Sequence, residues 1–310
     1  MPGVHNTIEG AIGNTPLVRL NRVVPDGAAE IYVKIESGNP TGSYKDRMAL
    51  AMIDEAEKRG DLKPGQAVVE YSGGSTGSSL AFVCAIRNHP LTIVTSNAFA
   101  QAKLRTMQAF GARLVLIESP TGQITPDLIP SMMVEAKRIA AEEGAYWTDQ
   151  FNNADAVAGY RRIGEELLEQ LDRPIDIYTG GVGTAGMLTG VASALRAAGR
   201  PTEIVALEPA SAPLITTGVK GSHRVEGIGV GFYPPLLTEG SIDRAIAIDE
   251  TEARVMAKRL AREEGIFAGV SSALNVVGAI HLAQELGPGK TVVTVAVDSG
   301  LKYLQGDLFE

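Results

Sequence analysis

The chain contains, from residue 175 to residue 186, the run Ile-Asp-Ile-Tyr-Thr-Gly-Gly-Val-Gly-Thr-Ala-Gly. Residues 175–179 predict a buried strand, a helical pattern follows near 186–198, and another apolar run occupies 204–207. A strand, a helix and a second strand in this order predict a βαβ unit, whose two strands lie parallel. Glycines between the strand and the helix indicate a ligand site, because ligands bind beyond the carboxyl ends of strands in open α/β sheets.

The same alternation of strands and helices continues along the chain. Further strands are predicted at 31–35, 67–71, 91–95, 114–117 and 292–297. Helices are predicted near 45–59, 77–87, 100–110, 127–143, 156–171, 251–264 and 272–286. The pattern predicts an α/β protein with open, mostly parallel sheets flanked by helices. Pro-containing stretches at 118–130 and 232–240 predict loops.

Composition places the chain among ordinary soluble globular proteins. Hydrophobic residues make up 45% and charged residues 21% of its 310 residues, and the net charge is −8. This charge argues against a nucleic-acid surface. The single cysteine, Cys84, lies in an apolar run, which excludes a disulfide within one chain and a multi-cysteine metal site and predicts a small buried residue. No signal-peptide pattern or membrane-length apolar run is found, so we expect a cytoplasmic protein that does not bind a membrane. We also expect no metal site.

The glycine run at 180–186 is typical of an anion site. Backbone N–H groups at the start of a helix, together with the helix dipole, attract a phosphate, and Thr184 adds a hydroxyl. The same residues fit the dinucleotide pattern G-x-G-x-x-G at 181–186, and Glu208 lies near the place of a ribose-binding acid. The segment alone therefore leaves a phosphate ligand, NAD and a structural turn as alternatives.

A lysine follows a turn before the helix expected at 45–59. The segment 38–47 reads Gly-Asn-Pro-Thr-Gly-Ser-Tyr-Lys-Asp-Arg, in which Asn39 to Gly42 have turn chemistry. One interpretation makes Ser43 a helix cap and Lys45 a solvated residue. The other places Lys45 at a sheltered strand–helix junction, where a lysine loses its proton more readily and its neutral amine forms a Schiff base.

A second glycine-rich loop follows the strand expected at 67–71. Residues 71–79 read Tyr-Ser-Gly-Gly-Ser-Thr-Gly-Ser-Ser and open the next helix. A loop of this kind binds a carboxylate or a phosphate through backbone N–H groups and hydroxyls. The alternative is a helix start that is merely capped by serine and threonine.

Taken together, these segments resemble the cysteine synthase (O-acetylserine sulfhydrylase) and cystathionine β-synthase family, which are fold type II pyridoxal 5′-phosphate (PLP) enzymes similar to tryptophan synthase β. The resemblance extends over nearly the whole chain in order. It is carried by Gly13–Leu20, Lys34–Glu36, Asn39–Arg47, Phe110–Leu116, Asp149–Asn152, Gly183–Met187, Glu208–Pro209, Gly227–Phe232, Val270–Ser272 and Asp298–Leu304. Two domains with PLP in the cleft between them are the fold that it implies.

The resemblance also implies roles for residues of this chain. Lys45 would hold PLP covalently and act as base and acid at the substrate Cα. The cofactor phosphate would bind to Gly183, Thr184, Ala185, Gly186 and Met187. Ser271 would hydrogen-bond the pyridine nitrogen, and Ser75 would face the ring hydroxyl. The substrate would contact Ser72, Gly73, Gly74, Thr76, Gln150 and Gly227.

The activity implied by the resemblance is β-replacement on an activated serine such as O-acetylserine. The reaction would pass through an aminoacrylate and end with the addition of sulfide or a thiol, as in cysteine biosynthesis. Cystathionine β-synthase activity, serine or threonine dehydratase (lyase) activity and a catalytically quiet PLP protein that binds a partner are the alternatives. A smaller mobile domain would comprise 42–148 and a larger one 1–41 with 149–310, in a homodimer.

The chain departs from the family pattern in three loops and at Tyr44. The family's T-S-G-N-T-G is Ser-Gly-Gly-Ser-Thr-Gly at 72–77, so that a shorter Ser75 replaces asparagine and Gly73 replaces serine. We expect a roomier pocket beside Gly73. In the glycine turn G-T-G-G-T becomes Gly-Thr-Ala-Gly-Met at 183–187, which removes one hydroxyl. The asparagine–proline pattern after Phe151 is also absent, and Tyr44 replaces a smaller residue, with packing as its expected role.

Overall fold

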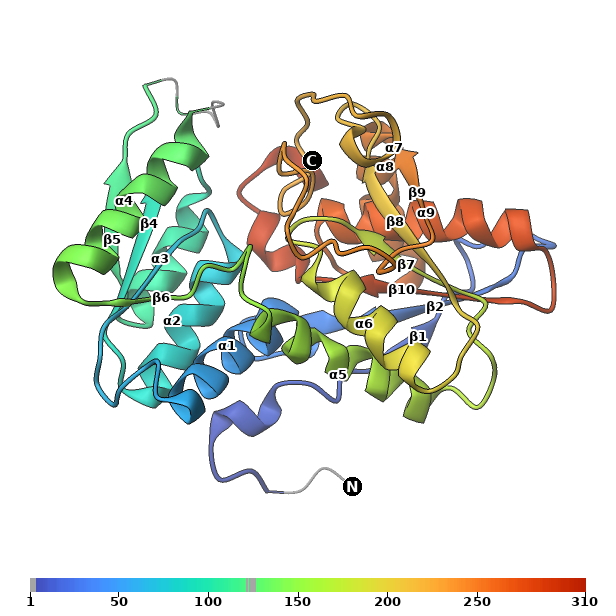
Figure 1. Cartoon of the computed structure of the whole chain (residues 1–310). Coiled ribbons are helices and arrows are strands. Elements are labelled where there is room, and N and C mark those ends of the chain that lie inside the picture. The colour runs from blue at the N-terminus through green and yellow to red at the C-terminus, as the bar shows by residue number, and fades with distance from the viewer. Residues whose placement is uncertain (1–3, 121, 123–126) are drawn as a thin grey trace. The chain divides into compact units, whose positions relative to one another are not determined.

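The computed structural model describes residues 4–120, 122 and 127–310 and divides into two compact units. Unit 1 comprises Met1–Gly10 and Lys45–Gly159, and unit 2 comprises Ala11–Tyr44 and Tyr160–Glu310. The chain therefore passes between the units more than once (Figure 1). Each unit contains one sheet of its own.

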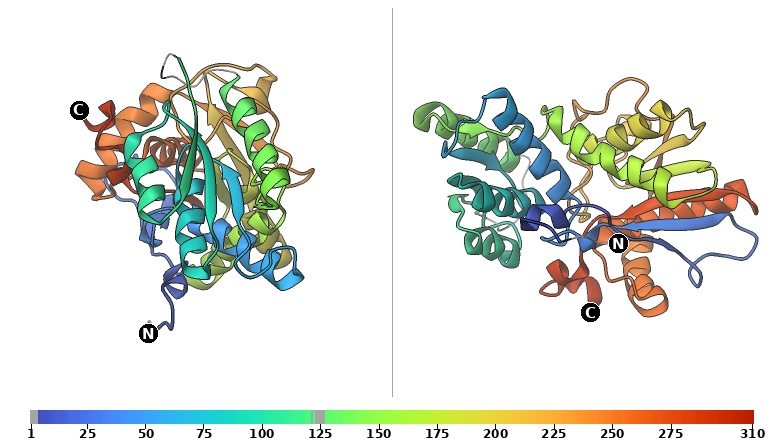
Figure 2. Two further views of the ribbon diagram at one scale, coloured as in Figure 1. Left: turned by 90° about the vertical axis from the view of Figure 1, so that its left-hand side faces the viewer. Right: turned by 90° about the horizontal axis from the view of Figure 1, so that it is seen from below.

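Unit 1 is built on a four-stranded parallel sheet in the order β5-β4-β3-β6. Its strands are β3 (Val68–Tyr71), β4 (Leu91–Ser96), β5 (Arg113–Ile117) and β6 (Tyr146–Trp147). Its helices are α1 (Lys45–Arg59), α2 (Ser75–Arg87), α3 (Gln101–Ala109) and α4 (Leu128–Glu143). The left view of Figure 2 shows α4 on one face of the sheet and α2 and α3 on the other. With both faces covered, β3 and β4 are buried along their whole length.

Unit 2 is built on a six-stranded sheet in the order β1-β2-β10-β7-β8-β9, in which only β1 is antiparallel. Its strands are β1 (Leu17–Arg19), β2 (Glu30–Ile35), β7 (Ile177–Gly181), β8 (Glu203–Pro209), β9 (Arg244–Ile248) and β10 (Thr291–Ala296). Its helices are α6 (Gly186–Ala197), α7 (Leu214–Thr217), α8 (Glu250–Arg259) and α9 (Val270–Leu286), while α5 (Asp155–Gln170) begins in unit 1. The right view of Figure 2 shows α6 and α9 on opposite faces of this sheet.

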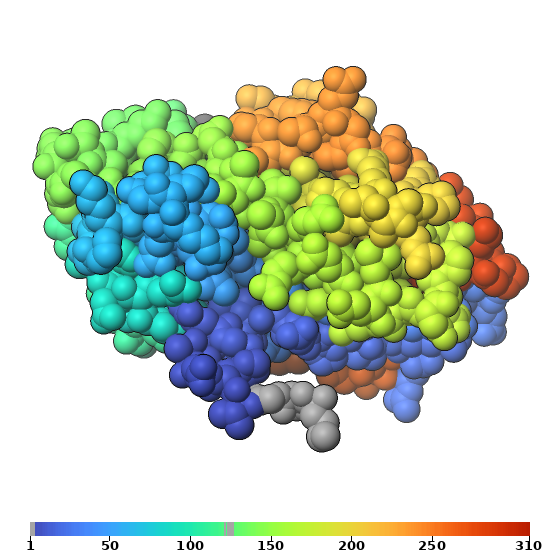
Figure 3. All heavy atoms as spheres, turned by 60° about the horizontal axis from the view of Figure 1, so that its bottom comes forward, coloured from blue at the N-terminus to red at the C-terminus, as the bar shows by residue number. Residues whose placement is uncertain are grey.

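Short helical segments complete the chain. They are the 3₁₀ helices Ile8–Ala11, Glu36–Gly38, Gly300–Tyr303 and Asp307–Phe309 and the π-helical turn Leu260–Glu264. Residues 4–10 lie against the helices of unit 1 (Figure 3). Glu9 pairs there with Arg87 of α2 at 2.5 Å. This ion pair joins the N-terminal 3₁₀ helix to the end of α2, which lies far away in the sequence.

The predicted α/β class with mostly parallel, helix-flanked sheets is confirmed. The expected strand at 175–179 was misplaced, because β7 runs from Ile177 to Gly181 and pairs with β8 up to its last residue. The loop expected at 118–130 is wrong at its end, where α4 begins at Leu128, while residues 121 and 123–126 lie outside the described residues. The predicted loop at 232–240 is confirmed.

Cys84 is buried in α2, as predicted, and burial raises the pKa of its thiol to about 12. Tyr44 is also buried and packs on the ring of Tyr160, with ring centroids 5.1 Å apart, which confirms its expected packing role. Among the described residues, no helix combines the length and the apolar character that crossing a membrane requires.

Candidate functional site

Lys45 is the first residue of α1, directly after the turn that the sequence places before the helix. The backbone leading to it is held by unit 2, where the Tyr44 N–H donates to the Val297 carbonyl at 2.9 Å and Ser43 forms a β-bridge with Asp298. Only 7% of Lys45 is exposed. The interpretation of Lys45 as a solvated surface residue is therefore wrong.

Burial lowers the pKa of Lys45 from 10.5 to about 8. The cause is desolvation, which disfavours the charged ammonium and leaves the neutral amine within reach of physiological pH. Lys58, on the same helix, is exposed and pairs with Asp54 and Glu55. Lys45 is thus the α1 lysine whose surroundings suit a nucleophile.

The loop Ser72–Gly77 is organised by its first side chain. Ser72 Oγ accepts hydrogen bonds from the Gly74 N–H at 3.1 Å and the Gly77 N–H at 3.0 Å. Gly74 therefore uses its N–H inside the loop. Among the described residues, no acceptor is found for the N–H groups of Gly73 and Thr76, which lie where α2 begins. Donors of this kind at the start of a helix, together with the helix dipole, favour an anion.

Gln150 lies beside this loop, as the resemblance implies. The Thr76 hydroxyl donates to Gln150 Oε1 at 2.8 Å, and Gln150 Nε2 donates to the Tyr71 carbonyl at 3.2 Å. The Tyr71 carbonyl can only accept a hydrogen bond, so the end of the Gln150 amide that faces it must be the NH₂ group. Among the described residues, no acceptor is found for the second N–H of that amide.

The roomier pocket expected beside Gly73 is not present. An added Cβ on Gly73 would lie 2.2 Å from Cε1 of Phe99, so the aromatic ring fills the space that a serine side chain would need. The family's small polar side chain at position 73 is thus absent, and the aromatic ring of Phe99, from the segment before α3, occupies its place. No sequence pattern indicated this contact, because it joins two separate loops.

The glycine turn after β7 is packed tightly against another glycine segment of unit 2. An added Cβ on Gly183 would lie 2.3 Å from the Gly227 carbonyl oxygen, and the Gly229 N–H donates to the Val182 carbonyl at 2.9 Å. Gly227 itself has φ +88°, a backbone conformation that favours glycine. The structure therefore brings together two segments whose roles were predicted separately.

Ala185, the residue before α6, has φ +68°. A left-handed backbone costs a residue with a Cβ roughly 1–2 kcal/mol, and the family has glycine here. We expect Ala185→Gly to raise the free energy of unfolding by about 0.5–1 kcal/mol, since part of the relief is lost to the greater freedom of glycine in the unfolded chain. Thermal unfolding of the cofactor-free protein measures this change in stability. If the stability of Ala185→Gly is unchanged or lower, the backbone at Ala185 is not strained.

The Met187 side chain turns into the core rather than toward the turn. Tyr178 donates its hydroxyl hydrogen to Met187 Sδ at 2.9 Å, and the methyl group of Met187 packs under Gly180. Met187 therefore offers an anion at this turn only its backbone N–H, in the first turn of α6. Thr184 is buried, and its hydroxyl lies 3.4 Å from the Gly186 N–H.

Helix α9 carries two polar side chains one turn apart. Ser271 is 4% exposed, and within the described ranges no residue hydrogen-bonds its hydroxyl. Asn275 accepts from the Gly181 N–H at 2.7 Å and donates to the Val295 carbonyl at 2.9 Å, which fixes the end of β7. Asn275 was missed, although an asparagine four residues after Ser271 in an apolar helix is a readable signal.

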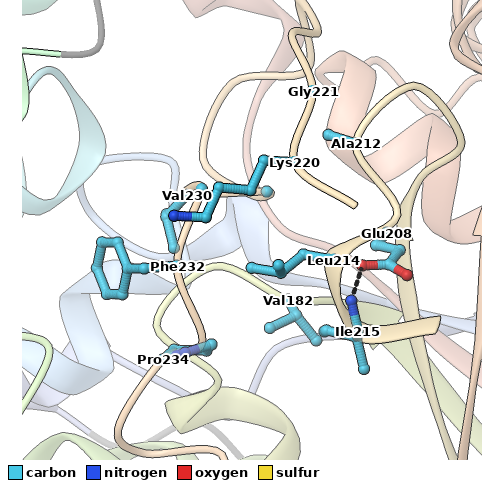
Figure 4. Close-up of a pocket in the computed structure, with 12 residues that line it drawn as sticks. Val182, Glu208, Ala212, Leu214, Ile215, Lys220, Gly221, Val230, Phe232 and Pro234 are labelled. Carbon is cyan, nitrogen blue, oxygen red and sulfur yellow. Dashed lines mark hydrogen bonds between the residues drawn. The ribbon is translucent and has the colours of Figure 1, made fainter. Parts of the chain in front are cut away.

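Glu208 does not have the surroundings of a ribose-binding acid. Its carboxylate accepts from the N–H groups of Ile215 and Thr216 and from the Thr216 hydroxyl, at 2.7–2.8 Å. Figure 4 shows Glu208 facing Ile215, at the edge of a small pocket that is lined by Val182, Leu214 and Phe232. Glu208 thus caps α7, and the NAD interpretation loses its acid.

In the described ranges, no group of three or more His, Cys, Asp or Glu side chains is placed to hold a metal ion. The polar groups described above are instead an amine, hydroxyls and an amide of unit 1 and hydroxyls and backbone N–H groups of unit 2, each in its own unit. Such a set binds carboxylates and phosphates.

Known proteins resemble the chain over nearly its whole length. A cysteine synthase of Staphylococcus aureus is 40% identical over 306 residues, which cover 98% of this chain and 97% of that protein. The solved structure of O-ureido-L-serine synthase superposes with a TM-score of 0.92 at 35% identity, over 99% of this chain and 96% of that one. The solved structure of a cysteine synthase from Entamoeba histolytica superposes with a TM-score of 0.93 at 31% identity, over 99% of this chain and 91% of that one.

The family model described as pyridoxal-phosphate dependent enzyme matches residues 8–298. This range includes Lys45, the Ser72–Gly77 loop, the Gly183 turn and Ser271. The chain therefore belongs to the family of pyridoxal-phosphate dependent enzymes.

Proposed function

We propose that this PLP-dependent enzyme catalyses β-replacement on O-acetylserine, with sulfide or a thiol as the nucleophile and cysteine or a close relative as the product. The observation that carries the proposal is Lys45, which is buried at the start of α1 with its pKa lowered to about 8. Likeness to cysteine synthases over nearly the full chain supports the choice of substrate. The NAD alternative is not favoured, because Glu208 caps α7.

The residues present fit PLP. When bound, PLP supplies an aldehyde that joins covalently to an amine and a ring that withdraws electrons from the substrate Cα. The neutral amine of Lys45 suits the aldehyde, and the N–H groups of Gly183–Met187 suit the phosphate. The buried hydroxyl of Ser271 suits the pyridine nitrogen. A neutral serine, unlike an aspartate, leaves that nitrogen unprotonated, which favours loss of a β-substituent over transamination.

Substrate binding is assigned to the loop Ser72–Gly77. We propose that the Gly73 and Thr76 N–H groups and the amide of Gln150 hold the substrate carboxylate, while Ser72 and Gly74 keep the loop in shape. Ser75 is assigned to the cofactor ring hydroxyl, and Gly227 to the substrate side of the glycine turn. Lys45, as a neutral amine, also serves as the base that removes the Cα proton.

Incubation of the purified protein with O-acetylserine and sulfide tests the proposal. Cysteine should form at a rate that depends on both compounds, and acetate should be released in equal amount. Serine with homocysteine tests for cystathionine formation, and release of a keto acid without a nucleophile tests for dehydratase activity. If no amino acid changes the absorbance of the bound cofactor, the protein is a quiet PLP binder and the proposal is wrong.

The pH dependence of cofactor uptake follows from the pKa of Lys45. Only the neutral amine attacks an aldehyde, so uptake of PLP by the cofactor-free protein should rise about tenfold per pH unit and level off near pH 8. An exposed lysine, with its pKa near 10.5, would give a rate that still rises above pH 9. Stopped-flow absorbance measures the rate, and a continued rise at high pH would contradict the effect of burial.

Domain movement, assembly and location are proposed from the resemblance. A smaller domain of about residues 42–148 is expected to close over the substrate, and two copies are expected to form a homodimer in the cytoplasm. Light scattering gives the mass in solution, and protection of the Ser72–Gly77 loop from hydrogen exchange on substrate addition reports closure.

A further inference from the structure

Glu70 is a buried carboxylate of unit 1 that the proposed reaction does not use. It precedes the last residue of β3 and is 0% exposed. Its Oε1 accepts from the Tyr71 N–H at 2.9 Å, and its Oε2 accepts from the Thr148 hydroxyl at 2.6 Å and the Gln150 N–H at 3.0 Å. One carboxylate therefore joins the end of β3 to the segment that follows β6.

The donors around Glu70 require both of its oxygens to act as acceptors. The N–H groups of Tyr71 and Gln150 face different oxygens of the carboxylate, and neither N–H can accept a hydrogen bond. Desolvation raises the pKa of Glu70 to about 7, and the hydrogen bonds from Thr148 and the two N–H groups oppose the rise. Above that pH the ionised form, which satisfies all three donors, prevails.

The carboxylate also bonds to both sides of a left-handed turn. Asp149, between the two Glu70 partners Thr148 and Gln150, has φ +45°. An aspartate adopts this left-handed conformation more readily than most residues that carry a Cβ, and the hydrogen bonds on either side of Asp149 hold it there. The bonds on either side of Asp149 thus set the direction in which Gln150 leaves the sheet, and Gln150 in turn meets Thr76.

We propose that Glu70 is a positioning residue for the substrate carboxylate, because it orients Gln150 and, through Gln150, Thr76 in the Ser72–Gly77 loop. The inference rests on the proposed function, in which this loop binds the amino-acid substrate. It assigns to Glu70 no contact with substrate or cofactor.

The variant Glu70→Gln tests the inference. A glutamine side chain has one acceptor and one donor end, so in either orientation its NH₂ faces the N–H of Tyr71 or of Gln150. We expect the KM for O-acetylserine to rise about tenfold at pH 8, the size of one lost buried hydrogen bond, while kcat stays within about twofold. The absorbance of bound PLP should not change. A KM within about twofold of the wild type, or a loss in kcat alone, overturns the proposal.

A matched control and a double variant separate positioning from general destabilisation. Glu57→Gln makes the same chemical change in unit 1, at the far end of α1, where Glu57 pairs with Arg87 and His89. Its KM should equal that of the wild type. In the double variant Glu70→Gln with Gln150→Ala, KM should be no higher than in Gln150→Ala alone, because both changes act through one side chain. Additive effects would overturn the proposal.

The proposal for Glu70 can still be tested if the variant does not fold or if the wild-type enzyme makes no cysteine. If Glu70→Gln does not fold, Thr148→Val removes only the hydroxyl donor and should raise KM about threefold, and an unchanged KM overturns the proposal. If the wild-type enzyme makes no cysteine, the proposed function fails by itself. Glu70 is then tested by the concentration of L-serine that shifts the cofactor absorbance, which Glu70→Gln should raise and Glu57→Gln should not.

Discussion

Replacing Lys45 by alanine is expected to remove the visible absorbance of the bound cofactor and to lower turnover by about 10³-fold or more. The amine of Lys45 is the proposed attachment point for PLP and the base at the substrate Cα, so one substitution removes two functions. Its position supports both, since it is 7% exposed and its pKa is lowered to about 8. Spectra and steady-state rates of the purified variant measure the two effects.

The control for this variant is Lys58→Ala. Lys58 belongs to the same helix, but its side chain is 59% exposed and its pairs with Asp54 and Glu55 lie at the surface. Exposed pairs of this kind contribute little to stability, so Lys58→Ala should keep colour, activity and stability. A Lys45→Ala protein that stays yellow, or that keeps more than a tenth of the wild-type turnover, would refute the role of Lys45.

The sequence predicted regular elements well where their patterns were long. The helix expected at 45–59 has those bounds in the structure, because an apolar stripe follows a turn and basic residues lie near its end. The strands β1 and β6 were missed, since runs of three and two residues are too short to show a period. Strand β9 was missed although its alternating run Arg244–Ile248 is a readable pattern.

The glycines of β7 show why an element's end is hard to place. Gly180 and Gly181 suggested a loop, yet they pair with Ala206 and Leu207 of β8 and belong to the strand. Their small size serves packing, because a Cβ on Gly180 would lie 2.6 Å from the Met187 methyl carbon. That contact is made by a side chain from the following helix, so composition alone could not separate a packing glycine from a turn glycine.

The parts of the candidate site that lie within one sequence segment could be predicted. The contacts between two distant segments could not. The order of motifs identified Lys45, the Ser72–Gly77 loop and the Gly183 turn, and the assigned roles of the individual residues stay predictions. The ring of Phe99 beside Gly73 and the bonds of Glu70 to Thr148 and Gln150 join residues far apart in sequence. Such contacts need the sheet order of unit 1, which the motifs do not contain.

Replacing Gly183 by alanine is expected to weaken PLP binding about 100-fold. The added Cβ would lie 2.3 Å from the Gly227 carbonyl oxygen, a backbone atom that moves only with its segment. That segment is tied to the turn by the bond from the Gly229 N–H to the Val182 carbonyl, so relief requires the turn to shift. Overpacking of this kind costs about 1–3 kcal/mol, and the N–H groups proposed for the phosphate shift with the turn.

The control for Gly183→Ala is Gly38→Ala, also in unit 2, where an added Cβ meets nothing closer than 3.8 Å. Titration of the cofactor-free proteins with PLP gives the two affinities, and their thermal unfolding shows whether each variant is folded. Gly38→Ala should bind PLP as the wild type does. A Gly183→Ala protein that binds PLP within about threefold of the wild type would mean that the turn tolerates the added carbon or that the phosphate binds elsewhere, and either result removes the turn from the proposed cofactor site.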